Sequence, residues 1–69
     1  MLGEQEATVL EVKPLGLHGV TYYDVAVRFP DGTVEQPRLG PEGVPEELQP
    51  GEVVLATRVA NMVISLRRP

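Results

Sequence analysis

The sequence predicts a small all-β protein, a barrel of five short strands with one helical turn between the third strand and the fourth. Two observations predict this fold class. Apolar and polar residues alternate with a period of two in several short runs, which is typical of strands, and no long stretch carries a helical period. The seven glycines and seven prolines gather mainly between these runs, where they mark turns.

The length of 69 residues limits the chain to one domain, spanning residues 1–69. A domain of this size buries only about 60% of the surface that its unfolded chain exposes. Domains below roughly 70–80 residues are usually stabilised by disulfides, a metal or a second subunit. Because the sequence has no cysteine and one histidine, we expect no metal and no other cofactor, and a dense β-core or a homo-oligomer instead.

Charge and hydropathy limit the partners. The net charge is −4, which is the wrong sign for a protein that binds phosphate backbones. No apolar run is long enough to span a membrane, and the N-terminal residues are acidic where a signal peptide is basic. We therefore expect a cytoplasmic protein with no membrane association. The prolines between the strands are also compatible with a thermophilic source.

The clearest strand covers residues 21–29, and the turn that follows is Pro30-Asp31-Gly32. Proline suits the first turn position, and glycine tolerates the left-handed conformation. A three-residue loop with a glycine bulge would place Asp24 opposite Arg38, whereas a two-residue turn would slip the register by one residue and reverse every side chain. Proline at the first central position favours the three-residue loop.

The third strand, residues 33–39, contains Pro37, which cannot donate to a sheet ladder. It is therefore an edge strand, or it stops pairing at the proline. A short helical turn is expected next, because Pro45 suits a first helical position and acidic residues follow it. Pro50-Gly51 ends this turn, and we expect Leu48 to point from it into the core.

The first strand is predicted over residues 7–13. Leu10 and Val12 are expected on one face of this strand and Val9 on the other, so the strand is either buried on both faces or bends partway. Residues 14–20 are predicted to be a loop. The last two strands, residues 52–59 and 62–68, flank Ala60-Asn61, a two-residue turn with Asn61 at positive φ. The opposed apolar pairs on one face are then Val59 with Met62, Thr57 with Ile64, and Leu55 with Leu66.

Five strands with a helical element between the third and the fourth resemble the oligonucleotide-binding fold, a small Greek-key barrel. The SH3-like barrel is the alternative. It also has five strands, but its 3₁₀ turn normally separates the fourth strand from the fifth. We therefore favour the oligonucleotide-binding-like topology.

Few residues could support catalysis. The only serine, Ser65, is predicted within a strand, and no histidine and acid are spaced to form a triad with it. The glycines form no phosphate-binding motif. The carboxylates of Glu46 and Glu47 suit the start of a helical turn and are expected to be solvated. We expect no catalytic residues and no enzymatic activity.

Four residues are candidates for ligand binding. His18 lies between glycines in the predicted loop, where its imidazole can contact a ligand. Tyr22 is the one aromatic residue expected to point outward, beside Arg28, and Arg58 adds a further positive charge. A protein that binds single-stranded nucleic acid needs a basic groove with aromatic platforms, and this function is the alternative that the negative net charge disfavours.

Surplus apolar residues favour association with a protein. Val9, Val54 and Val63 are predicted on outward faces, unless coiling of the barrel turns Val54 and Val63 into the core. The predicted loop adds Leu15, Leu17 and Val20 to the apolar surface, which is large for a lone small barrel. The sequence therefore predicts a binding or assembly module that associates with a protein partner or, more simply, with a second copy of itself.

Overall fold

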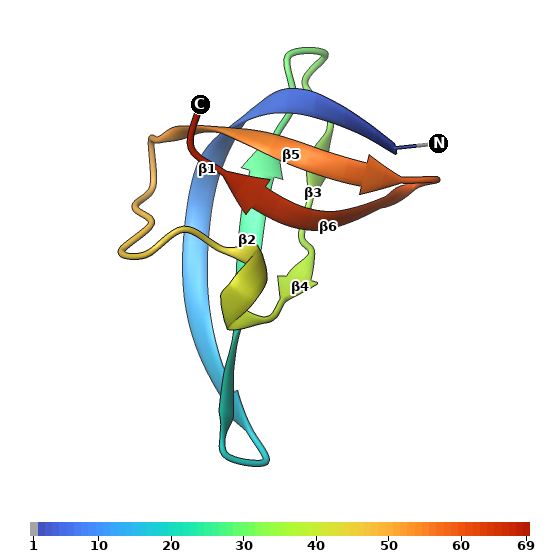
Figure 1. Cartoon of the computed structure of the whole chain (residues 1–69). Helices are drawn as coiled ribbons and strands as arrows, with labels where there is room; N and C mark the ends of the chain where they lie inside the picture. The colour runs from blue at the N-terminus through green and yellow to red at the C-terminus, as the bar shows by residue number, and fades with distance from the viewer. Residues whose placement is uncertain (1) are drawn as a thin grey trace.

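The computed structural model describes residues 2–69 and consists of one antiparallel β-sheet with a single 3₁₀ turn (Figure 1). The elements are β1 (Leu2–Leu17), β2 (Val20–Arg28), β3 (Val34–Glu35), β4 (Arg38–Leu39), η1 (Pro41–Gly43), β5 (Val53–Val59) and β6 (Met62–Arg67). The all-β class is confirmed. The strand order is β3-β2-β1-β5-β6, with β4 also pairing with β2. The described strands leave the sheet open, so the predicted closed five-stranded barrel is not confirmed.

The long strand β1 joins the two halves of the sheet. Its first part pairs with β5, and its second part pairs with β2, with Thr8 opposed on both sides. The register with β2 shifts between Val9 and Glu11, which leaves Leu10 as the extra residue of a β-bulge. The bulge reverses the side-chain alternation, so Val9 is buried and Val12 packs against the core, while Leu10 is exposed. The bend that was one of the two alternatives for the first strand is therefore a β-bulge at Leu10.

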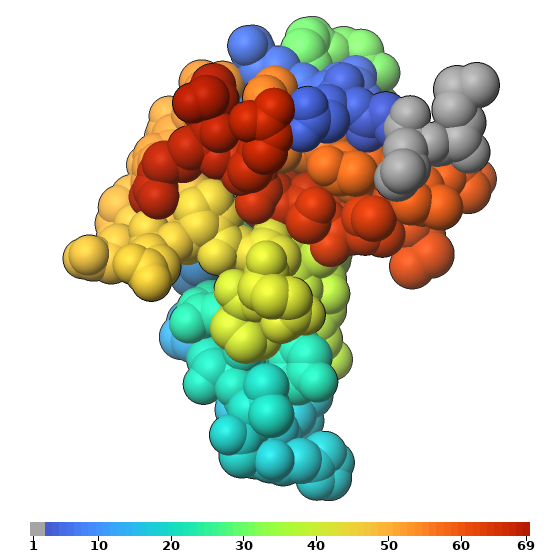
Figure 2. All heavy atoms as spheres, in the orientation of Figure 1, coloured from blue at the N-terminus to red at the C-terminus, as the bar shows by residue number. Residues whose placement is uncertain are grey.

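Residues 14–20 are not the predicted loop, because β1 and β2 continue as a hairpin. Leu17 opposes Val20, and His18 and Gly19 alone form the turn. Both turn residues have positive φ, 51° and 79°, as a type I′ hairpin turn requires. We call residues 13–24 the arm; Figure 2 shows its end projecting from the rest of the molecule.

The turn after β2 has the predicted three-residue form. The Phe29 amide donates to the Thr33 carbonyl at 2.9 Å, and Gly32 has φ 91°. Asp24 consequently lies opposite Arg38, as predicted. Pairing along this edge is interrupted between β3 and β4, where Pro37 lies, so the third predicted strand is two short ones.

The helical turn lies earlier than predicted. It is η1, beginning at Pro41, and the residues after Pro45 form a non-helical turn instead. Both prolines suit a first helical position, so the sequence did not distinguish them. η1 packs against β6, where a Cβ on Gly43 would lie 3.3 Å from the Ile64 carbonyl oxygen. Leu48 is buried in the core, as predicted.

The β5–β6 hairpin contains a second bulge. Val59 opposes Met62 as predicted, but the register shifts beyond Arg58, and Ile64 is the extra residue. The pairs expected farther from the turn are therefore wrong: Leu55 opposes Arg67 and Ala56 opposes Leu66. At the turn, positive φ falls on Ala60, not on Asn61.

This bulge corrects the predicted inner and outer faces. Both Val63 and Leu66 point into the core, three positions apart, which an unbroken strand would forbid. Val9, Val54 and Val63, predicted as a self-association surface, are 1%, 0% and 6% exposed. All three therefore lie in the core and form no surface for a partner. For Val54 and Val63, this position agrees with the alternative in which coiling of the barrel turns them inward. The buried apolar residues are Ala7, Val9, Val25, Val27, Phe29, Leu39, Leu48, Val54, Ala56, Val63 and Leu66.

Surface ion pairs predict lower stability in acid. Hydrogen bonds from Arg67 lower the pKa of Glu4, and hydrogen bonds from Arg68 and the Gln49 amide lower the pKa of Glu52, each from an ordinary value of 4.5. The unfolded chain regains the ordinary value. These groups therefore stabilise the fold above about pH 4.5, and the contribution is lost as the pH falls through the lowered values.

We expect a lower midpoint of urea unfolding at pH 3 than at pH 7, measured by circular dichroism. The Glu4→Gln variant, which cannot titrate at this position, should show a smaller difference between the two pH values. An identical midpoint at both pH values in the parent protein would contradict the assignment.

Candidate functional site

The arm is the strongest candidate for an interaction surface. Opposed residues of a hairpin share a face, so the pairs Leu15–Tyr22 and Leu17–Val20 place four apolar or aromatic side chains together. We call these four residues the arm face. Leu17 is 38% exposed and Val20 is 43% exposed. The arm face lies on the part of the hairpin that projects from the body (Figure 2).

Charged residues lie at the base of the same face. Asp24 and Lys13 are opposed on β2 and β1, and Arg38 of β4 donates to Asp24 at 2.8 and 3.1 Å. These hydrogen bonds hold the pKa of the Asp24 carboxyl below its ordinary value. Lys13 also pairs with Glu11 at 3.6 Å. The charges therefore compensate one another, and the arm face itself carries none.

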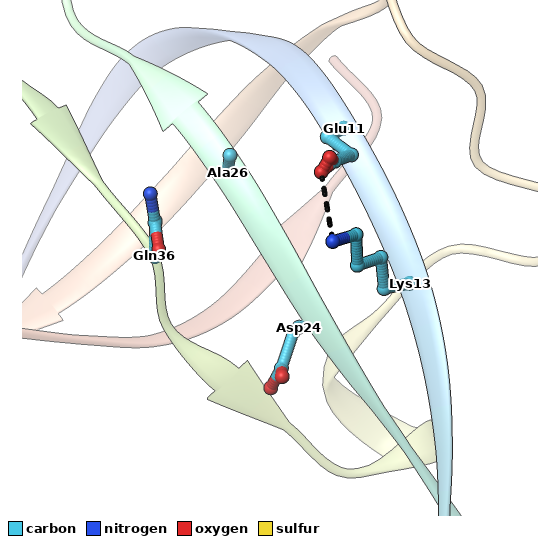
Figure 3. A pocket seen from close by; sticks show the side chains of 5 residues that line it. All are labelled: Glu11, Lys13, Asp24, Ala26 and Gln36. Atoms are coloured by element: carbon cyan, nitrogen blue, oxygen red, sulfur yellow. Dashed lines mark ion pairs between the residues drawn. The ribbon is translucent and has the colours of Figure 1, made fainter.

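A hollow of about 230 Å³ lies at this base. Figure 3 shows the side chains that line it, which come from β1, from β2 and from Gln36. Its lining is mainly polar and open to solvent. The opposite side of the arm base has a larger cleft, of about 440 Å³, between β1, β2 and the segment of residues 41–48. Tyr23 and Val12 line that cleft and also pack against the core, so this side of the arm base already contacts the protein's own chain.

His18 has a structural role in the arm. It is the first residue of the two-residue turn, and its φ of 51° lies in the left-handed region that few side chains adopt readily. His18 is therefore a residue of a tight hairpin turn and not of the predicted loop. Among residues 2–69, no group of three histidine, aspartate or glutamate side chains could hold a metal ion.

We expect His18→Asn to stabilise the protein by about 0.5 kcal/mol, because Asn-Gly is the preferred type I′ sequence. The melting temperature should rise by roughly 2–4 °C for a domain of this size. Self-association should be unchanged, as measured by sedimentation. A lower melting temperature would contradict the turn assignment.

Tyr22 and Arg28, predicted to lie side by side, are far apart. They occupy positions six residues apart on β2, which corresponds to roughly 20 Å along a strand. Asp24 lies on the same face between them. The two residues therefore cannot form one compact binding site.

Arg58, the fourth predicted binding residue, points into the molecule. Its guanidinium carbon lies 4.5 Å from the centre of the Phe29 ring, and it forms an ion pair with Glu35. The Arg58 and Glu35 side chains are 25% and 29% exposed. This pair links β5 to β3, which are not adjacent in the sheet, and so helps to hold together the open side of the fold.

We expect Arg58→Met to destabilise the fold by about 1–2 kcal/mol, because it removes the cation–π contact and leaves Glu35 half-buried without a partner. The double variant Arg58→Met/Glu35→Gln should recover part of this loss. Urea unfolding of the single variants, the double variant and the parent measures the coupling. Equal stability of Arg58→Met and the parent would refute the structural role.

The other arginines, apart from Arg28, also form ion pairs with carboxylates. In the described chain, Arg38 pairs with Asp24, Arg67 with Glu4, and Arg68 with Glu52. A nucleic-acid groove needs cations directed at phosphates beside aromatic platforms, and these arginines are instead directed at carboxylates. No helix in residues 2–69 is long and apolar enough to cross a membrane.

No protein-family model, curated protein or solved structure matches the chain. What this protein binds must therefore be inferred from its own surface.

The arm as an ordered element was missed in the sequence, although a signal for it exists. Apolar residues alternate strictly through Leu15 and Leu17, and again through Val20 and Tyr22, on either side of a two-residue His-Gly turn. This is a hairpin pattern. Gly16 and Gly19, which are typical of loops, obscure this alternation.

Proposed function

We propose that this protein is a small, non-enzymatic assembly module that associates with a second copy of itself through the arm face. The observation that carries the proposal is the position of the four side chains of the arm face. They lie together on a projecting hairpin. The two most exposed, Leu17 and Val20, lie at its end.

Three features favour a second copy as the occupant. The arm face is uncharged, so two copies of a protein with net charge −4 can approach there without placing like charges in contact. A twofold axis lets one patch serve both partners. A domain of this size without disulfides also gains stability from a second subunit. The four side chains bury less than the ~800 Å² per partner of a standard interface, so we expect a micromolar dissociation constant.

We further propose that the fold is an oligonucleotide-binding-like barrel left open on one side. Its support is the central strand β1, which pairs with both β2 and β5, and a helical element that follows the interrupted third strand. The arm is then an extended form of the hairpin between the first two strands.

Sedimentation velocity over a hundredfold concentration range, from about 5 to 500 µM, tests the proposal. We expect the weight-average mass to rise from that of a monomer toward that of a dimer. A strict monomer at the highest concentration would remove self-association. Titration with oligo-dT at low salt tests the nucleic-acid alternative, and we expect no binding, because four of the five arginines already pair with carboxylates.

A further inference from the structure

The open side of the sheet is a groove between two strand edges. Among the described strands, β3 and β4 form one end of the sheet, and β6 forms the other. Residues 35–38 form one wall of a groove of about 330 Å³, and residues 61–63 form the opposite wall. No pairing joins these two walls in the described sheet. The edge formed by β3 and β4 can therefore accept a further strand.

The backbone of the first wall is directed into the groove. The Val25 amide of β2 donates to the Pro37 carbonyl at 3.1 Å. Because backbone groups alternate in direction along an antiparallel strand, Gln36 and Arg38 direct their amides away from β2. Proline usually blocks an edge strand, but Pro37 occupies an inward position, so the amides of the outer edge are intact.

Two exposed apolar side chains flank the groove, whose walls also contain polar and charged residues. Met62 is 67% exposed on one side, and Val34, next to the other wall, is 49% exposed. The charged residues of the walls, Glu35 and Arg38, each form an ion pair with a residue outside the groove. The groove therefore suits a segment that carries apolar side chains and little charge.

We infer that the groove binds an extended peptide segment of another protein as an added β-strand. Main-chain hydrogen bonds to Gln36 and Arg38 recognise the segment, and apolar side chains at alternate positions contact Met62 and Val34. The edge of a folded second copy does not fit, because its own neighbouring strands would collide with the opposite wall. This site is separate from the arm face and does not depend on self-association.

Amide hydrogen exchange, measured by NMR, tests the inference with a synthetic peptide as the probe. The probe is an octapeptide of alternating threonine and valine with a lysine added at each end. In the free protein, we expect the amides of Gln36 and Arg38 to exchange as fast as those of loop residues. At saturating peptide, we expect their exchange to slow at least tenfold.

Two variants separate edge pairing from nonspecific contact. Gln36→Pro removes one outward amide and should weaken peptide binding at least tenfold. Pro37→Ala is the matched control, because it adds an amide that faces β2 and should leave peptide binding unchanged. The arm variant Leu17→Asp should also bind the peptide normally, so failure of this inference is distinguishable from failure of the proposed self-association.

Three results would each overturn the inference. Slow exchange of both amides in the free protein at all concentrations would mean that the two edges already pair. Protection that increases with protein concentration alone would identify a second copy as the occupant. Unchanged exchange at saturating peptide would show that the groove accepts no strand.

Discussion

Replacing Val54 with aspartate is expected to unfold the protein, whereas the same replacement at the neighbouring Val53 is expected to leave it folded. Val54 is fully buried and Val53 is 42% exposed. A buried, unpaired carboxylate costs more than about 4 kcal/mol. The total stability expected for a domain of this length is roughly 3–10 kcal/mol, so the cost is comparable to the whole.

Circular dichroism and urea unfolding measure both variants. Val53→Asp should cost no more than about 1 kcal/mol, the range of strand preference at an exposed position. Equal stability of the two variants would contradict the difference in burial between Val53 and Val54. If Val53→Asp were the more damaging, the faces of β5 would be reversed and the bulge at Ile64 would be misplaced.

The second large effect is expected in the arm. Leu17→Asp should raise the dissociation constant of the dimer at least a hundredfold, because it places a desolvated charge in an apolar interface and removes an apolar contact. The stability of the monomer should change little, since Leu17 is exposed near the end of the arm and is not part of the buried core. Sedimentation equilibrium measures the constant.

Thr21→Asp is the matched control for this variant. Thr21 opposes Gly16 on the other face of the same arm, so the added charge lies only one pair farther from the turn but points away from the arm face. Its dimer should form as in the parent. Equal association of Leu17→Asp and the parent would show that the arm face is not the interface.

Local chemistry made two features of this fold predictable. Pro30 and Gly32 specify a three-residue loop, and the register of that loop correctly pairs Asp24 with Arg38. Pro37 likewise predicted the interruption of the edge strand. In each case, one residue restricts the backbone at its own position, and no distant contact is needed to decide the outcome.

The two bulges could not be predicted in this way, because a bulge depends on both faces of a strand. Val9 and Val12, and again Val63 and Leu66, are apolar residues three positions apart that both face the core. Strict alternation places one member of each pair outside. That assumption produced the incorrect outward positions of Val9, Val54 and Val63, and with them the incorrect self-association surface.

Arg58 was misjudged for a related reason. A charged residue on a strand is usually solvated, and its inward position is tolerated here only because Glu35 and the Phe29 ring lie on another part of the sheet. A contact between residues so distant in sequence follows from the topology. The local sequence pattern around Arg58, Glu35 or Phe29 does not indicate this contact.

Disulfide capture with single-cysteine variants tests the proposed assembly most directly, since the chain has no cysteine of its own. Under mild oxidation, Leu15→Cys on the arm face is predicted to form a covalent dimer at concentrations where the parent associates. Thr21→Cys, on the opposite face of the same arm, is predicted to remain largely uncrosslinked. Equal crosslinking of the two variants, or preferential crosslinking through Thr21→Cys, would contradict dimerisation through the arm face.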